Sequence, residues 1–263
     1  MAHVSLSVRD INVLEKIRDP ESDPSRAIQI DPSLPKDPHI SDPELYESIS
    51  QQEVDIIRSL SSLGGPNVSE ADVVEGYRKA VSRFGQLIEE YPHYASARNN
   101  RAQALRGLYG DSILIADAPR SPQALLHSVD EKERLGASKT ALGDLDRAIS
   151  LLSPITPHTK LSPQVVKTLA GAHVQRAGIY LITSKLMVSK SVSVDASRPE
   201  SKWMRLDFEA NASKDFEMAG RYGNEQAKRL AVAINPTAKL CGQMVREAMK
   251  REYGPCYASG SSD

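Results

Sequence analysis

The sequence has few aromatic residues, almost no net charge and only two cysteines, and each of these shortages argues against a class of fold or of partner. Of its 263 residues, 5% are aromatic and 40% are hydrophobic, which favours helices packed through aliphatic side chains over an aromatic-rich sandwich. Lys and Arg number 33 against 34 Asp and Glu. A net charge of −1 does not indicate a nucleic-acid or an acidic-membrane partner. The length allows one large domain or two small ones with a real core.

Long hydrophobic runs are also missing. No stretch approaches the roughly 20 apolar residues that span a bilayer, and the opening "MAHVSLSVRD" lacks the basic head and apolar run of a signal peptide. Cys241 falls in an expected helix and Cys256 in a Gly/Ser-rich tail, and we expect both to be reduced thiols. The sequence therefore predicts a cytoplasmic protein without a membrane partner, with access to the nucleus left open.

Motifs for catalysis, metal binding and nucleotide binding do not occur either. The six histidines, at positions 3, 39, 93, 127, 158 and 173, include no pair at i, i+4 and no H-E-x-x-H. There is no G-x-x-x-x-G-K phosphate loop and no G-x-G-x-x-G. We therefore expect no catalytic residue, no metal and no cofactor, and we predict that the protein is not an enzyme.

What the sequence does contain is a repeated helical pattern. In "ADVVEGYRKAVSRFGQLIEEYP", Ala80 is followed by large apolar residues at i+4, i+7, i+8 and i+11, which share one helix face. A small residue followed four positions later by a large apolar one recurs twice. The three pairs are Ala80 and Phe84, Ala141 and Leu145, and Ala212 and Phe216.

Each of these helices follows another expected helix that contains small residues. The three preceding segments are residues 43–63, 91–105 and 165–182. Ala102 in the second and Ala177 in the third are small enough to let the two helices of a pair approach closely. The pattern predicts an all-α solenoid of about three helix–turn–helix pairs.

The copies are unevenly spaced, so two insertions must separate the helices within a pair. Residues 110–135 and 184–205 supply them, and their Pro and Ser content predicts surface loops. Trp203, at the end of the second insertion, is expected to attach that loop to the helices.

The repeat domain is expected to cover residues 43–252. Residues 1–42 form an arm with a short amphipathic segment, and its apolar side is Val8, Ile11, Leu14 and Ile17. A helix beginning at Asn235-Pro236 is expected to cap the last pair, as terminal repeats require. The tail, residues 253–263, is expected to be disordered.

The spacing of small and large residues, closed by Pro92, resembles the tetratricopeptide repeat, a unit of about 34 residues. More narrowly, "SARNNRAQALRGLYGD", "ALGDLDRAISL", "VQRAG" and "AINPTAKLCGQM" follow the order seen in the tetratricopeptide repeat protein 36 family, and the leader "VLEKIRDPES" is similar too. The likeness covers most of residues 8–252 apart from the insertions. It implies a non-enzymatic adaptor linked to seventy-kilodalton heat-shock chaperones and to tyrosine metabolism, through stabilisation of a tyrosine-degrading enzyme. The implied partners are such a chaperone, a metabolic enzyme client, or both.

Five polar residues are candidates for contact with a partner in the groove of the repeats: Asn99, Asn100, Gln103, Arg106 and Arg176. Many tetratricopeptide adaptors hold a terminal carboxylate with a clamp of Lys, Asn and Arg, and Asn100 matches its central asparagine. Gly171 and Gln175 stand where the third helix of that clamp should offer cations, and the first helix is acidic apart from Arg58. Because a carboxylate needs converging cations, the clamp is mostly missing.

The candidate polar residues also have purely structural interpretations. Asn99 and Asn100 could simply hydrogen-bond to neighbouring backbone, and the arginines at 98, 101, 106 and 176 could form a solvated face. The alternative function is a small-molecule enzyme or sensor that uses the insertions as a lid. The sequence offers that alternative no nucleophile–base pair, metal cluster or cofactor loop.

Overall fold

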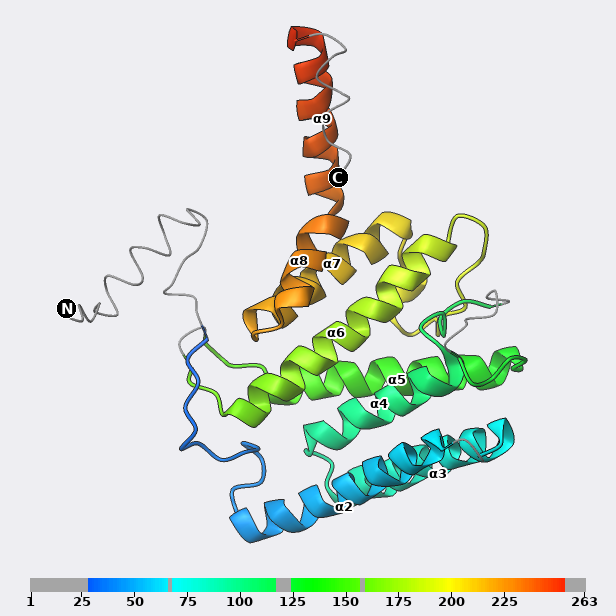
Figure 1. Cartoon of the computed structure of the whole chain (residues 1–263), viewed down its shortest axis with the longest axis vertical. Coiled ribbons are helices and arrows are strands. Elements are labelled where there is room, and N and C mark those ends of the chain that lie inside the picture. The colour runs from blue at the N-terminus through cyan, green and yellow to red at the C-terminus, as the bar shows by residue number, and fades with distance from the viewer. Residues whose placement is uncertain (1–27, 66–67, 117–123, 157–158, 254–263) are drawn as a thin grey trace, which may run out of the picture.

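The computed structural model describes residues 28–65, 68–116, 124–156 and 159–253. Its helices pack in chain order, each against the next, and so form an α-solenoid (Figure 1). The described helices are α2 (Pro43–Ser61), α3 (Glu70–Glu90), α4 (Ala95–Tyr109), α5 (Glu131–Leu152), α6 (Pro163–Leu186), α7 (Arg205–Arg221), α8 (Glu225–Ile234) and α9 (Pro236–Tyr253), with 3-10 turns η2 (Ser62–Gly64) and η3 (Pro199–Lys202). The predicted all-α solenoid class is confirmed. No described helix combines the length and apolarity needed to cross a membrane.

Local sequence signals set where several helices begin. The side chains of Asp42, Ser69 and Ser162 accept hydrogen bonds from backbone N–H groups in the first turns of α2, α3 and α6. Proline occupies the first position of α2 and α6, where its missing N–H costs nothing. These caps fix where α2, α3 and α6 begin.

Small residues lie between the helices, as the spacing of the repeats requires. The eight residues expected at the helix contacts are all buried, with at most 4% of their surface exposed: Ala80, Phe84, Ala102, Ala141, Leu145, Ala177, Ala212 and Phe216. One apolar cluster joins α2, α3 and the start of α4 around Ile49 and Phe84. A larger cluster runs from α4 to α8. Alanine at these contacts lets neighbouring helix backbones come close.

The first insertion is not the surface loop that its composition predicts. It covers the residues between α4 and α5, and Ile113, Leu114 and Ile115 are each 0% exposed. The Ser193 N–H of the second insertion donates to the Leu114 carbonyl at 2.7 Å, and Ile115 pairs with Val192 in an isolated β-bridge. This pairing of the two insertions satisfies backbone groups and buries the apolar run, which is why the surface expectation is wrong here.

The second insertion, between α6 and α7, stays largely at the surface, with Val188 80% exposed. Its end is attached by Trp203, as expected. The Trp203 ring lies edge-on to Tyr180 of α6 and to Phe208 of α7, with ring centroids 5.1 Å apart in both cases. These contacts hold the end of the loop between two helices of the core.

The C-terminal cap is α8, whereas the sequence pattern placed it in residues 236–252. Ala227, Ala231 and Ile234 of α8 are buried against α7. A Cβ atom at Gly220 would lie 2.9 Å from the Cβ of Lys228, so glycine is needed for this close approach. Helix α9 instead projects from the body and leaves its apolar row exposed, including Leu240 at 57% and Met244 at 62% (Figure 1).

The described part of the N-terminal arm has no helix, makes turns at residues 31–34 and 37–40, and lies against the repeats. The Asp31 N–H donates to the Leu161 carbonyl, and the Leu161 N–H to the Gln29 carbonyl, each at 2.9 Å. These bonds join the arm to the loop between α5 and α6. The expected amphipathic segment at residues 8–17 and nearly all of the expected tail lie outside the described residues.

Candidate protein-binding groove

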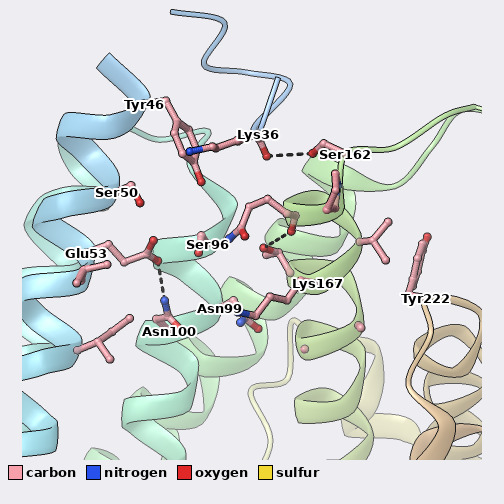
Figure 2. A pocket seen from close by; sticks show the side chains of 18 of the residues that line it. Lys36, Tyr46, Ser50, Glu53, Ser96, Asn99, Asn100, Ser162, Lys167 and Tyr222 are labelled. Carbon is pink, nitrogen blue, oxygen red and sulfur yellow. Dashed lines mark hydrogen bonds between the residues drawn. The ribbon is translucent and has the colours of Figure 1, made fainter. Parts of the chain in front are cut away.

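A cavity of about 1030 Å³ opens between α2, α4 and α6 on the concave side of the solenoid (Figure 2). The arm contributes Pro32, Leu34 and Lys36 to its lining, and the turn between α7 and α8 contributes Tyr222. Because α4 lies between α2 and α6, a bound segment would meet α2 on one side and α6 on the other (Figure 2). We call this cavity the groove.

The α2 side of the groove carries exposed aliphatic side chains beside the polar residues Glu47, Ser50 and Glu53. Val54 and Ile57 are 38% and 40% exposed, although α2 buries Ile49 and Ile56 on its other face. Leu34 of the arm, 36% exposed, adds to the same lining. Large aliphatic side chains left uncovered along a concave surface are typical of a binding site.

Glu53 is a buried carboxylate at the base of this wall, only 5% exposed. Its Oε1 accepts a 2.6 Å hydrogen bond from Asn100 Nδ2 (Figure 2), and its Oε2 accepts one from the Tyr94 hydroxyl. Burial raises the pKa of Glu53, and hydrogen bonds from Tyr94, Ser96 and Asn100 offset only part of that effect. Asn100 is thus engaged by a carboxylate of the protein itself, and not by backbone.

Asn99 lies on the α6 side of α4. Its Oδ1 accepts a 2.8 Å hydrogen bond from Gln175 Nε2, which also bonds to the Asn99 carbonyl at 3.1 Å. A Cβ on Gly171 would lie 3.3 Å from Asn99 Nδ2, so glycine leaves room for the amide. Gln103 is exposed and lines the same groove one turn along α4.

Lys167 is the basic residue that α6 presents to the groove. It is exposed, and no described acidic side chain forms an ion pair with it. Figure 2 shows its side chain reaching over Asn99. The sequence pattern left Lys167 out of the candidates, although residues 167 and 171 are one helical turn apart and share a face. That spacing is the signal that could have found it.

Arg106 and Arg176, two of the five candidates, do not line the groove. Arg106 Nε donates to Asp111 at 2.7 Å. Arg176 holds Asp215 through two bonds of 2.7 and 2.8 Å, and also reaches Asp146 at 2.8 Å. The structure brings together Asn99, Asn100 and Gln103, and places the two arginines elsewhere.

The arginines are not a solvated face either. Arg98 and Arg101 of α4 both bond to Asp144 of α5, which is 2% exposed. Hydrogen bonds from Arg176 and His173 hold the pKa of Asp215 below its usual range, although burial alone would raise it. Charge-assisted bonds of this kind join successive helices and fix their register.

A smaller cavity of about 280 Å³ lies beneath the second insertion, between α6 and α7. Four of its charged lining residues, Asp146, Arg176, Glu200 and Asp215, form ion pairs within the protein. Arg176 bonds to Asp146 and Asp215, and Glu200 bonds to Arg198 and accepts from the Tyr180 hydroxyl at 2.6 Å. Among the residues that the structure describes, no three His, Cys, Asp or Glu side chains gather as metal ligands would.

Fold and groove together define the class: a helical-repeat solenoid with a concave binding surface of the tetratricopeptide kind. Over 253 residues the chain is 37% identical to the L-tyrosine degradation gene cluster protein hmgX of Aspergillus fumigatus, covering 94% of this chain and 93% of that protein. It is 28% identical over 247 residues to the tetratricopeptide repeat protein 36 homolog of Drosophila melanogaster, covering 94% and 96%. The Bos taurus tetratricopeptide repeat protein 36 is 29% identical over 177 residues, covering 67% and 62%.

The chain belongs to the tetratricopeptide repeat protein 36 family. This confirms the resemblance drawn from the repeat motifs. No protein-family model matches the chain, and no solved structure matches it.

Proposed function

We propose that the protein is a non-enzymatic adaptor that binds a segment of a partner protein in the groove and serves L-tyrosine degradation. The observation that carries the proposal is the groove itself, about 1030 Å³, with the aliphatic side chains of Val54 and Ile57 left uncovered on one wall. Burial of this exposed aliphatic surface by a partner would contribute favourably to the free energy of binding. The family membership and the name of the Aspergillus relative support the pathway.

The partner we propose is an enzyme of tyrosine breakdown, held and stabilised as a client, with a seventy-kilodalton heat-shock chaperone as a second partner. The family resemblance supports both, and the cytoplasm is the proposed location. Stabilisation of a client needs only that the adaptor binds its folded state in preference to the unfolded one.

The test is affinity capture of the full chain from a lysate of its source, with quantitative mass spectrometry. Ile57→Lys places a charge in the groove, and Val188→Lys is the matched control, because Val188 is 80% exposed in the second insertion. A tyrosine-degrading enzyme or a chaperone that is lost with Ile57→Lys and kept with Val188→Lys supports the proposal. Partners kept equally by both variants would show that the groove is not the binding surface.

The alternative, a small-molecule enzyme or sensor with the insertions as a lid, has the smaller cavity beneath the second insertion as its site. Arg176, Asp146, Asp215 and Glu200 in its lining already form ion pairs within the protein, so a ligand would have to compete with pairs such as Arg176 with Asp215. We therefore favour the adaptor. A small molecule that co-purifies with the full chain and is lost on Trp203→Ala would favour the alternative.

A further inference from the structure

The α6 side of the groove has hydrogen-bond donors without acceptors. Lys167 forms no ion pair within the described ranges, whereas Lys36, elsewhere in the same lining, reaches Glu47 at 3.4 Å. Asn99 Oδ1 is occupied by Gln175, and Asn99 Nδ2, close to Gly171, donates to no described acceptor. The ammonium group of Lys167 and the amide N–H of Asn99 thus lie on one side of the groove, and both can donate hydrogen bonds to a carboxylate.

The two carboxylates that line the groove do not serve these donors, since Glu47 pairs with Lys36. Both oxygens of Glu53 accept hydrogen bonds, one from Asn100 and one from the Tyr94 hydroxyl. Figure 2 shows Glu53 on the α2 side of α4, with Lys167 on the α6 side. The groove is therefore asymmetric: the exposed aliphatic side chains of Val54 and Ile57 lie on α2, and the donors of Asn99 and Lys167 lie on the facing side, on α4 and α6.

An extended peptide fits this asymmetry through its own geometry. Successive side chains of an extended chain point in opposite directions. A segment that runs along the groove can turn one side chain to Val54 and Ile57 and the next one to Lys167 and Asn99. Adjacent residues of the partner must then be one large aliphatic and one acidic.

We propose that the groove recognises an internal, extended segment of its partner in which Asp or Glu stands directly beside a large aliphatic residue, with Lys167 and Asn99 binding the acid and Val54 and Ile57 the aliphatic side chain. This inference rests on the adaptor function proposed above and names the chemistry of the partner. The segment is internal because a terminal carboxylate needs several converging cations, and Gly171 and Gln175 supply none.

The experiment is selection from a library of random peptides fused at both ends within a carrier protein, so that no free terminus is offered. The full chain is the bait, alongside Lys167→Glu, Ile57→Ser and the control Lys190→Glu, which reverses an exposed lysine outside the groove. The full chain and the control should enrich Asp or Glu directly beside Leu, Ile, Val or Phe. Lys167→Glu should enrich Lys or Arg in place of the acid, and Ile57→Ser should weaken the aliphatic preference.

A selected peptide then allows a charge exchange. Its affinity should fall about fivefold or more on Lys167→Glu, as expected for the loss of an exposed ion pair, and should recover when the acid of the peptide is replaced by lysine. Enriched peptides without an acid, or an acid preference unchanged by Lys167→Glu, would overturn the inference.

Failure of the inference and failure of the adaptor function are distinguishable. If no peptide is enriched but a cellular partner is still lost with Ile57→Lys, the proposed chemistry is wrong while the groove remains the binding surface. If no peptide is enriched and Ile57→Lys keeps every partner, both proposals fall.

Discussion

At the scale of single residues, Ala102 marks how closely two helices approach. It is 0% exposed on α4, in the cluster that joins α4 to its neighbours, whereas the adjacent Gln103 is exposed in the groove. A larger side chain at position 102 has no space to occupy without moving a helix.

We expect Ala102→Leu to lower the free energy of unfolding by about 1–3 kcal/mol through overpacking. The control Gln103→Leu adds a similar side chain on the exposed face and should change stability by no more than about 0.5 kcal/mol. Thermal or urea unfolding measures both. Equal melting temperatures for the two variants would place Ala102 outside the helix contact.

The burial of Glu53 predicts how the stability of the protein depends on pH. Because burial raises its pKa in the folded protein above that of the unfolded chain, the folded state binds more protons between the two values. The contribution of Glu53 to stability is therefore greatest at low pH and falls as the pH rises through this window. Glu53→Gln removes the titrating group, so the stability of the wild type relative to this variant should decline as the pH rises above the ordinary Glu value of about 4.3.

Urea unfolding of both proteins across that range tests the prediction, because the other acids cancel in the difference. Asp215, for example, has a lowered pKa, so its contribution to stability increases with pH. That contribution is the same in the wild type and in Glu53→Gln, and the comparison therefore removes it. A stability difference that stays flat, or that increases with pH, would contradict a raised pKa of Glu53 in the folded protein.

At the scale of elements, the two insertions differ in what they contribute. The first carries the fully buried residues Ile113, Leu114 and Ile115, and its backbone bonds to the second at Ser193. The second exposes Val188, and it is attached at several points, among them the ion pair of Arg198 with Asp146 and the packing of Trp203. Residues 113–115 of the first insertion therefore belong to the core, whereas most of the second insertion does not.

Leu114→Ala should accordingly lower the free energy of unfolding by about 2–5 kcal/mol, because it leaves a cavity among buried side chains. Val188→Ala removes an exposed aliphatic group and should have an effect within about 0.5 kcal/mol. Chemical denaturation compares the two. A small effect of Leu114→Ala would show that the first insertion separates from the core in solution.

At the scale of the whole molecule, the packing of α2, α4 and α6 affects whether the groove can bind the terminal carboxylate of a peptide. Asn100, the match to the central clamp asparagine, is bound by Glu53 of α2. The approach of α6 puts Gly171 against Asn99, where a larger side chain would displace the amide. Both effects act against capture of a terminal carboxylate.

We therefore expect a peptide from a chaperone C-terminus to bind as the free acid and as the amide with affinities within about fivefold of each other, because a single exposed ion pair is worth about 1 kcal/mol at most. Calorimetric titration with the full chain measures this. Tight binding of the acid that disappears on amidation would restore the clamp. Loss of that binding in the Asn100→Ala variant would then show that Asn100 is part of the clamp.

The sequence by itself determined the helices and their contacts, because these depend on local periodicity. The small residues of the repeats, such as Ala141 and Ala212, follow the 3.6-residue period that also places them in the core, and Ser and Pro mark helix starts. Resemblance of short motifs was enough to indicate the family, since the motifs lie in these same helices.

Only the tertiary structure decided the rest, because it depends on residues far apart in the chain. The pairing of the insertions through Leu114 and Ser193, and the engagement of Asn100 by Glu53, join segments with no common period. Helix α8 became the cap because Gly220 lets it approach α7, a contact that no helical pattern encodes. The direction of a side chain is set by the element packed against it, so Arg106 and Arg176 turned to nearby acids and Lys167 was left facing the groove.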